Sequence, residues 1–350
     1  MNKKDVKYKA LETLKEYYND GKEISLPVPI KAIAKSYNIR VIPYSRHMKT
    51  LNMTLDELYN HAGTKDAYTD FDACSESYII IYNDMDYYIK TSNRYRWNIA
   101  HELGHILLGH HKKIQTKIGS NQLTQDEYAI LEKEANWFAS YILVPHSVLY
   151  SLNKFMNADS IKSYCRISNE AAKCREEDFN KWKENNKFFN NYDKELLKIF
   201  SHQHICENCK TLVDNKHLYC SVCGEKSDFN TYYKNSIKKK VEFMKYKNFL
   251  NDDGTLTVCP VCQNEEILKN AKYCHICGSS VVNGCLNDNY ELCEQARLNP
   301  IPSNARYCPY CGSNTVFKAI LPNWKEEQQT KTLSEEVEII KSLKDGPEDF

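Results

Sequence analysis

The sequence lacks two features that would assign a class at once, a large excess of charge and a long apolar run. Its 47 Lys and Arg nearly balance 46 Asp and Glu, so the formal net charge is +1. No global field therefore draws the chain to nucleic acid or to an anionic membrane. The longest apolar runs, such as Tyr78–Tyr82, are too short to cross a bilayer, and Met1–Ala10 is charged without an apolar signal segment. We expect a cytosolic protein without a membrane segment.

Cysteine is scarce in the first 197 residues and abundant afterwards. Twelve of the 15 cysteines follow Leu197, which places a domain boundary near residues 195–205. Paired Cys-x-x-Cys spacings in a long chain point to metal binding and not to a disulfide scaffold. The early cysteines, Cys74, Cys165 and Cys174, have no spaced partners. We expect them to be small buried apolar residues.

Helical periodicity dominates the first part of the chain. Apolar spacing, caps and prolines predict helices at 9–18, 30–37, 97–110 and 125–143, with one or two more over 161–182. Short strands are predicted at 39–42 and 77–82, with irregular residues between them. This pattern indicates an α+β fold with a small sheet. The charged end of the chain, 323–350, is predicted to be a loosely held tail with a helix at 337–343.

A His-Glu-x-x-His pentapeptide at 101–105 carries the main chemical signal. On a helix the four-residue step places His101 and His105 on one face, where both can bind one zinc ion. Glu102 stands beside them as the group that would take a proton from a metal-bound water. The pattern predicts metal-assisted peptide hydrolysis. The alternative is an amphipathic helix with two hydrogen-bonded histidines.

Two residues compete as the third metal ligand. His111 has the spacing of the extended motif, but that motif needs glycine at 108, where this chain has leucine. Glu134 shares an inward helical face with Leu131 and Phe138, and a buried carboxylate needs a partner. Glu132 can simply be solvated. The sequence favours Glu134 over His111.

Two long segments resemble the ImmA/IrrE-type zinc metallopeptidases. Residues 94–110 (RYRWNIAHELGHILLGH) look like that family's active-site helix, and residues 132–145 (EKEANWFASYILVP) resemble its second motif. The likeness covers roughly residues 1–185. It implies a gluzincin-like fold with His101, His105 and Glu134 on zinc and Glu102 as general base. It also implies that 77–82 is a sheet edge along which an extended peptide binds.

The sequence does not place the group that stabilises the oxyanion. Candidates are Arg94, Tyr95, Arg96 and Tyr141, each of which is more often structural. His110 either supports the metal site or lies at the helix C-terminus for electrostatic reasons alone.

Three groups of four cysteines, which we call modules 1, 2 and 3, resemble zinc ribbons. Each ribbon is built from two Cys-x-x-Cys turns, or knuckles, that close a tetrahedral zinc site. The second knuckles repeat in sequence as LYCSVCG, KYCHICG and RYCPYCG, while the first knuckle of module 3 departs from the spacing. The predicted ligands are Cys206, Cys209, Cys220 and Cys223 in module 1, Cys259, Cys262, Cys274 and Cys277 in module 2, and Cys285, Cys293, Cys308 and Cys311 in module 3.

The expected organisation is a peptidase domain followed by small metal-held lobes. The predicted ranges are 1–200 for the peptidase, 201–230 for module 1, 231–254 for a basic linker helix, 255–282 for module 2, 283–322 for module 3 and 323–350 for the tail. We expect zinc as the only cofactor, one ion catalytic and two or three structural. The lysines of the linker helix allow nucleic-acid binding, but solvated lysines on a packed helix are the simpler interpretation.

The leading functional hypothesis is a zinc endopeptidase whose modules recruit a protein partner. The resemblance implies that this partner is a helix-turn-helix transcriptional repressor, cut at one exposed site. The alternative is a zinc-ribbon adaptor, or a nucleic-acid-binding protein, whose peptidase domain has become a scaffold. The retained Glu102 favours the enzyme, because a scaffold needs at most the metal ligands.

Overall fold

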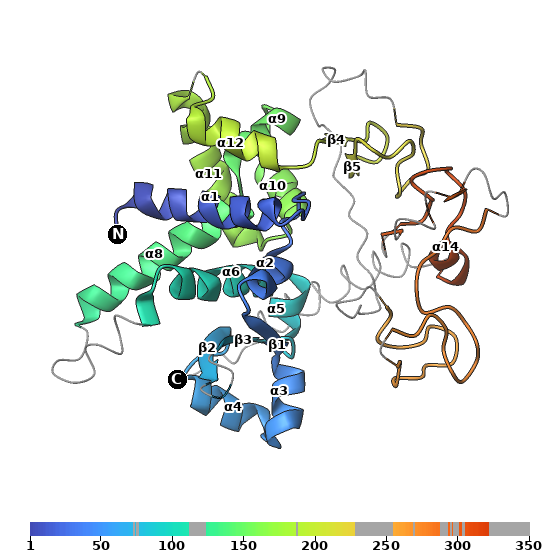
Figure 1. Ribbon diagram of the computed structural model, residues 1–350, viewed down its shortest axis with the longest axis horizontal. Coiled ribbons are helices and arrows are strands. Elements are labelled where there is room, and N and C mark those ends of the chain that lie inside the picture. The colour runs from blue at the N-terminus through green and yellow to red at the C-terminus, as the bar shows by residue number, and fades with distance from the viewer. Residues whose placement is uncertain are drawn as a thin grey trace, which may run out of the picture. The chain divides into compact units, whose positions relative to one another are not determined.

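The computed structural model describes most of the chain, in two compact units. The described residues are 1–72, 74, 77–111, 124–186, 188–227, 255–268, 270–287, 293–294, 296, 301–302 and 305–321. The units are Met1–Gln203 and His204–Phe350 (Figure 1), divided inside the interval that the cysteine distribution indicates. The predicted linker helix at 231–254 and the predicted tail at 323–350 lie outside the described residues.

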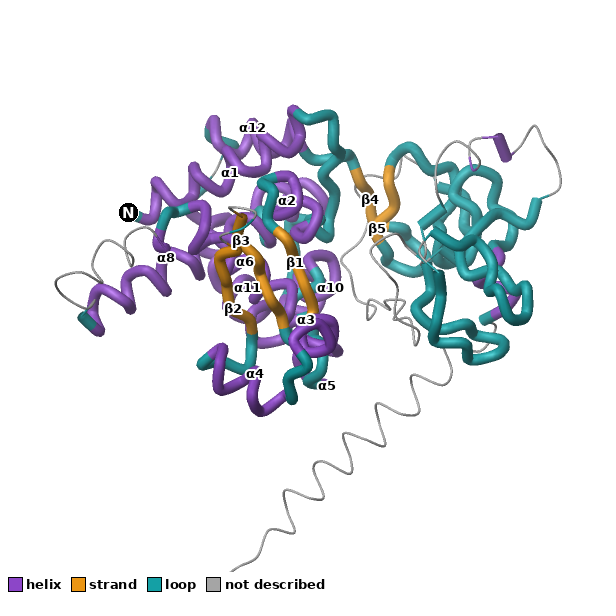
Figure 2. The backbone as a smooth tube through the Cα atoms, turned by 60° about the horizontal axis from the view of Figure 1, so that its bottom comes forward, coloured by secondary structure: helices purple, strands orange, loops and turns teal. Residues whose placement is uncertain are grey.

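Helices form most of the first unit (Figure 2). They are α1 (Lys3–Asn19), α2 (Ile30–Ser36), α3 (Tyr44–Leu51), α4 (Leu55–Ala62), α5 (Tyr87–Thr91), α6 (Arg94–Leu107), α8 (Gln125–Leu143), α9 (His146–Leu152), α10 (Ala158–Cys165), α11 (Asn169–Asn185) and α12 (Asn191–Ile199). The helix predicted at 125–143 has its predicted bounds. A capping box between Thr124 and Glu127 begins it, and it ends before Pro145.

Other predicted bounds shift for local reasons. The helix expected at 97–110 begins at Arg94 and ends at Leu107, where Gly109 follows with a φ of +72° that only glycine adopts readily. The segment 161–182 falls into two helices, separated at Arg166. Two helices and a strand, α3, α4 and β2, occupy the stretch predicted to be irregular.

A three-stranded sheet lies against α6. Its strands are β1 (Arg40–Pro43), β2 (Ala67–Asp72) and β3 (Ser77–Tyr82), in the order β1-β3-β2. β3 pairs in parallel with β1 and antiparallel with β2, so it is the central strand. The expectation that 77–82 forms the sheet edge is therefore wrong. The continuous apolar sequence of β3 is the reason, because a strand buried on both faces and paired on both sides belongs in the centre. The edge next to α6 is β2.

The core of the first unit centres on the crossing of α6 and α8. Apolar side chains of both helices are fully buried there, and α1 packs against α8 from the other side. Gly104 lies at the crossing. A Cβ atom at this position would come within 3.2 Å of the Phe138 side chain and 3.3 Å of the Ala135 backbone. The missing side chain lets the two helices approach closely, which brings their polar faces within contact distance of each other.

The described residues of the second unit contain little regular structure. Its elements are β4 (Gln203–Ile205), β5 (Leu212–Asp214) and α14 (Val316–Ile320). The second knuckles of the three modules share one backbone design: the amide of Cys220, Cys274 or Cys308 donates to the carbonyl five residues later, at 2.8, 2.8 and 2.7 Å. The glycine that follows each knuckle has a φ between +72° and +78°. The repeat read from the sequence is therefore a structural repeat.

The sequence also predicts the absence of a membrane segment and the burial of the three early cysteines. Among the described residues, no helix is long and apolar enough to cross a membrane. Cys165 is buried as expected, but Cys74 and Cys174 are exposed, so the prediction for these two thiols is wrong. Cys74 lies in the turn after β2 and Cys174 on α11, and both side chains are exposed to solvent.

Candidate metal centre and active site

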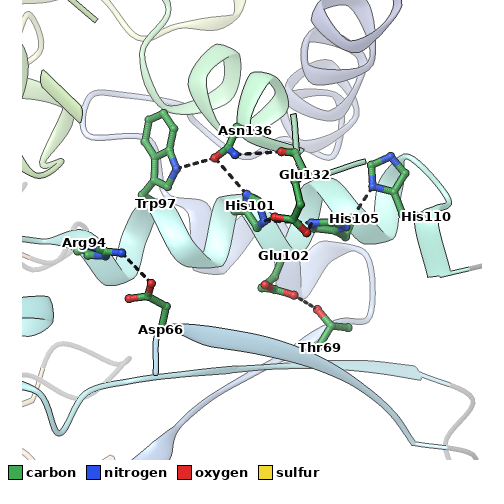
Figure 3. A network of polar contacts seen from close by, with 10 residues as sticks. All are labelled: Asp66, Thr69, Arg94, Trp97, His101, Glu102, His105, His110, Glu132 and Asn136. Carbon is green, nitrogen blue, oxygen red and sulfur yellow. Dashed lines mark hydrogen bonds and ion pairs between the residues drawn. The ribbon is translucent and has the colours of Figure 1, made fainter. Parts of the chain in front are cut away.

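The polar faces of α6 and α8 converge on a small cluster of ligand-type atoms (Figure 3). His101 Nε2 and His105 Nε2 are 3.0 Å apart. The Glu132 carboxylate places one oxygen 3.2 Å from His101 Nε2 and the other 3.4 Å from His105 Nε2. These three side chains form a group that can hold a metal ion.

The spacing of these atoms fits a tetrahedral metal. Zinc bonds of about 2.0–2.1 Å to nitrogen and oxygen, at tetrahedral angles, separate the ligand atoms by about 3.3 Å. The separations of 3.0, 3.2 and 3.4 Å lie around this value. Two imidazoles and one carboxylate are also a donor set that zinc prefers, with a fourth position left for water. The residues present therefore fit the metal.

Glu134, the third ligand favoured by the sequence, does not join this cluster. Its carboxylate is 1% exposed and lies 3.0 Å from His110 Nε2, and the Met1 amino group also contacts it. His110 Nδ1 in turn lies 3.1 Å from His105 Nδ1. The structure differs from the prediction: Glu134 is linked to His105 only through His110, and it is Glu132 that faces the two histidines.

The error has a physical cause. The helical periodicity of α8 predicts a metal ligand on its apolar face, where a carboxylate needs a partner. Glu134 is on that face, but its partner is His110. Glu132 is 33% exposed and lies at the border between the apolar and solvated faces. A site that admits substrate and water is open to solvent, so a partly exposed carboxylate suits it better than a sealed one.

Asn136 is a site residue that sequence reasoning missed. Its Oδ1 lies 3.3 Å from His101 Nδ1 and 3.4 Å from Trp97 Nε1, which donates to it. Its Nδ2 donates to the Glu132 carbonyl at 3.0 Å. A polar partner on the second ring nitrogen fixes the orientation of an imidazole ligand. The available signal was the spacing of four residues between Glu132 and Asn136, which puts both on one helical face.

Glu102 points from α6 toward the sheet, on the side away from Glu132 (Figure 3). Its Oε2 accepts a hydrogen bond of 2.6 Å from the hydroxyl of Thr69 on the edge strand β2. Burial raises the pKa of Glu102 above the ordinary value, although the Thr69 bond and the neighbouring His101 act in the opposite direction. A carboxyl group with a raised pKa in a partly enclosed site suits proton transfer near neutral pH.

The ligand group is electrostatically coupled. Burial disfavours the charged form of His101, but the hydrogen bond to Glu132 and the nearby carboxylates outweigh it and raise the His101 pKa. The hydrogen bonds from His101 and His105 hold the pKa of Glu132 far below its usual range. The lowered pKa favours the ionised carboxylate, which is the form that binds a metal.

The candidate oxyanion groups are engaged elsewhere. Arg94 pairs with Asp66, and the half-buried Arg96 donates to the Val28 carbonyl at 2.6 Å. Tyr95 packs its ring on Tyr82. The structure brings none of these three side chains to the metal group. Tyr141, the fourth candidate, has its pKa raised by burial, while the nearby Arg175 charge lowers it and the Asp178 charge raises it.

Two other side chains border the cluster. Tyr128 on α8 hydrogen-bonds to Glu132, and burial followed by the Glu132 charge raises its pKa. His111, the alternative third ligand, lies with its ring centroid 6.3 Å from that of His105 and 5.3 Å from that of Tyr78. His111 is not part of the metal-binding group, and its Nε2 is buried without a partner among the described residues.

The cysteines converge as the three modules require. Each module brings its four sulfur atoms within 4.8 Å of one another. In module 1, Cys206 to Cys223 is 3.7 Å and Cys209 to Cys220 is 3.5 Å. In module 2, Cys259 to Cys277 is 3.5 Å and Cys262 to Cys274 is 3.6 Å. Tetrahedral zinc–sulfur bonds of about 2.3 Å separate the sulfurs by about 3.8 Å, so both sets fit zinc.

Module 3 also brings its four thiols together, despite the irregular first knuckle. Cys293 lies 2.9 Å from Cys285, 3.3 Å from Cys311 and 3.8 Å from Cys308. Cys293 has a helical backbone conformation, unlike the knuckle cysteines, yet its sulfur reaches the same centre. All twelve late cysteines therefore belong to groups that can hold a metal.

Comparison with known proteins places this site in context. The family model of the IrrE N-terminal-like domain, peptidase family M78, matches residues 54–176. The match confirms the resemblance read from the sequence over α4 to α11 and includes every residue of the cluster formed by α6 and α8. No curated protein matches the chain.

Proposed function

We propose that residues 1–203 form a zinc-dependent endopeptidase with a gluzincin-like active site, in which His101, His105 and Glu132 hold the metal. The observation that carries the proposal is the convergence of these three side chains at tetrahedral spacing, with the Glu102 carboxylate on the next residue of the same helix. The family match over residues 54–176 supports a metallopeptidase-like domain independently.

Each neighbouring residue has a role in this proposal. Zinc, when bound, supplies a water whose pKa is lowered to about 7 and polarises the scissile carbonyl. Glu102 would accept a proton from the attacking water and deliver it to the leaving amine, while Thr69 fixes the carboxylate through its 2.6 Å hydrogen bond. Asn136 orients His101, and His110 with Glu134 orients His105.

The sheet suggests how a peptide binds. β2 is an edge strand, and the same strand carries Thr69, which contacts Glu102. Among the described residues, no other strand pairs with the outer edge of β2. An extended peptide can add to this edge through main-chain hydrogen bonds, which would present one peptide bond to the metal group. The geometry favours a segment that is unfolded or in an exposed linker.

The proposed substrate class follows from the resemblance. Peptidases of the ImmA/IrrE type act on helix-turn-helix transcriptional repressors, and we propose a single cut in an exposed linker of such a cytosolic protein. Modules 1, 2 and 3 each hold one structural zinc in this proposal and recruit the partner. Binding through a second surface raises the local concentration of the scissile segment at the active site.

The proposal is tested with the Glu102→Gln variant. Glutamine keeps the size of the side chain but cannot accept the proton, so we expect a full complement of zinc and a loss of hydrolysis of about a hundredfold or more. The assay compares zinc content by elemental analysis with cleavage of a helix-turn-helix repressor, mapped by mass spectrometry. Undiminished cleavage would remove Glu102 from the mechanism. Specific binding of the repressor without cleavage by the wild-type chain would instead favour a scaffold.

A further inference from the structure

Modules 1 and 3 pair with each other through their second knuckles, in an arrangement with twofold symmetry. We define the second knuckle as residues 218–227 in module 1, 272–281 in module 2 and 306–315 in module 3. The amides of Leu218 and Tyr219 donate to the carbonyl of Pro309 at 2.9 and 3.1 Å. Reciprocally, the amides of Arg306 and Tyr307 donate to the carbonyl of Ser221 at 2.7 and 3.0 Å.

The residues that exchange these bonds occupy equivalent places in the repeat. Counted from the first cysteine of each knuckle, Ser221 and Pro309 both follow it directly, and Tyr219 and Tyr307 both precede it. The knuckle face is therefore self-complementary: the same groups donate and the same group accepts on both sides.

The aromatic rings follow the same symmetry. The ring of Tyr307 covers Gly224, and a Cβ atom there would lie 2.9 Å from the ring carbons. The ring of Tyr219 covers the equivalent Gly312, again with a nearest distance of 2.9 Å. Glycine at the end of each knuckle thus does more than allow a positive φ. It leaves the space that the opposing tyrosine ring fills.

Module 2 has the same face without a partner among the described residues. Tyr273 is 65% exposed, whereas the equivalent Tyr219 and Tyr307 are half-buried. A Cβ atom at Gly278 would meet nothing within 4 Å, in contrast to the other two glycines. Within the described part of the chain, the amides of Lys272 and Tyr273 have no acceptor and the His275 carbonyl has no donor.

The backbone of this face is nonetheless formed. The amide of Val281 donates to the Lys272 carbonyl at 3.0 Å, as Thr315 does to Arg306 at 3.0 Å and Ser227 to Leu218 at 2.7 Å. Buried Leu256, Val281 and Phe317 hold module 2 from its other side, against α14. Module 2 therefore presents a formed copy of the pairing face, which includes the apolar Ile276 with 66% of its surface exposed.

We propose that the second knuckle of module 2 binds the second knuckle of module 2 in a second copy of this chain, in the geometry that modules 1 and 3 use. The chain has three copies of this self-complementary face. Modules 1 and 3 pair with each other, so the face of module 2 is left without a partner among the described residues. The face that fits it best is another copy of itself, which the chain supplies when two molecules meet. The pairing surface does not depend on the peptidase reaction.

The contact between modules 1 and 3 defines which groups meet in the proposed pair of module 2 knuckles. The Lys272 and Tyr273 amides of each copy donate to the His275 carbonyl of the other, and each Tyr273 ring covers the other Gly278. Four main-chain hydrogen bonds and two ring contacts make a small interface, and interfaces that bury less than about 1,200 Å² are typically transient. We expect a reversible dimer that dissociates on dilution.

The test uses the full-length, zinc-loaded chain and two matched variants. Sedimentation velocity over a range of concentrations should show a monomer–dimer equilibrium for the wild type. Tyr273→Asp should abolish the dimer, because it removes the ring and places two charges at the pair. Leu268→Asp makes a comparable change at an equally exposed apolar residue, 62% accessible and outside the second knuckle, and should leave the dimer intact. Elemental analysis checks that both variants keep their zinc.

A crosslink distinguishes the proposed partner from other occupants. Replacing Tyr273 with a photoreactive benzoylphenylalanine, in a mixture of isotopically heavy and light chains, should give heavy–light crosslinks to residues 272–281. A wild type that is monomeric at all concentrations would overturn the proposal, and so would a dimer that survives Tyr273→Asp. Crosslinks within one chain would also overturn it, because they would show that another segment covers this face.

Discussion

The two units of the chain reach a stable fold by different means. In the first unit the buried residues are aliphatic and aromatic side chains of packed helices, such as Leu14, Ile33 and Phe138. In the second unit the buried clusters are small, and cysteines make up much of them: Cys206 and Cys220 surround Val213 in module 1. Lobes of this size bury too little apolar surface to fold alone. In the proposed function, metal therefore serves chemistry in the first unit and folding in the second.

Removal of the metal ions should produce the largest difference between the two units. With a strong chelator, we expect modules 1, 2 and 3 to unfold completely, because four thiols around an empty centre do not hold a lobe together. The first unit should lose hydrolysis but keep its helices. Hydrogen exchange measures this directly: the amides of Cys220, Cys274 and Cys308 should lose all protection, while those in α8 keep theirs. Modules that stay protected would contradict the distinction.

Acid should weaken the first unit through a histidine that plays no part in catalysis. Burial, followed by the Arg175 charge, lowers the pKa of His146 from 6.5 to about 3. Its Nε2 has no hydrogen-bond partner within the described ranges, and its ring packs near Phe179 and Trp182. The unfolded chain takes up this proton as the pH falls below 6.5, whereas the folded chain does so only near 3. The contribution of neutral His146 to the free energy of unfolding is therefore fully present above pH 6.5 and is lost as the pH falls.

The size of this effect follows from one proton. Between about pH 6 and 4, the free energy of unfolding should fall by about 1.4 kcal/mol per pH unit from His146 alone. His146→Phe fills the same aromatic site without a titratable group. Between pH 6 and 4 its free energy of unfolding should therefore fall less steeply than that of the wild type, by about 1.4 kcal/mol per pH unit. Urea unfolding at several pH values, followed by helical circular dichroism, gives both curves. If wild type and His146→Phe lose stability with falling pH at the same rate, His146 is not held neutral in the folded protein.

A smaller effect is expected at the general base. The Thr69 hydrogen bond stabilises the ionised form of Glu102 and so lowers its pKa against the effect of burial. Thr69→Val removes the bond, raises the Glu102 pKa further and should move the acid limb of hydrolysis to higher pH. At pH 5 the loss should be about tenfold, since a hydrogen bond to a charged group contributes about 1.5–3 kcal/mol. Thr69→Ser keeps a hydroxyl and should retain the wild-type profile.

Much of the local architecture could be predicted from the sequence, because local signals specify it. The bounds of α8 follow from Thr124, Glu127 and Pro145, and the two histidines of α6 follow from their spacing. The knuckle repeat predicts the backbone of all three modules. Each of these features depends on residues within a few positions of one another.

The features that sequence reasoning missed depend on contacts between distant elements. The choice between Glu132 and Glu134 depends on how α8 is rotated against α6, which the close approach at Gly104 helps to set. The place of β3 at the centre of the sheet depends on β2, a strand whose alternating polar sequence gives only a weak signal. The pairing of modules 1 and 3 joins residues almost ninety positions apart, and no local pattern encodes it.

The most direct test of the proposed metal centre compares two glutamates on one helix. Glu132→Ala removes a ligand that contacts both histidines, so the chain should hold one zinc fewer than the wild type and lose all hydrolysis. Glu134→Gln keeps a hydrogen-bonding side chain beside His110 and should retain every zinc, with activity reduced by about tenfold to a hundredfold. Elemental analysis of the purified chains decides between them. A Glu132→Ala chain with its full zinc content, beside a Glu134→Gln chain that has lost one ion, would contradict the assignment.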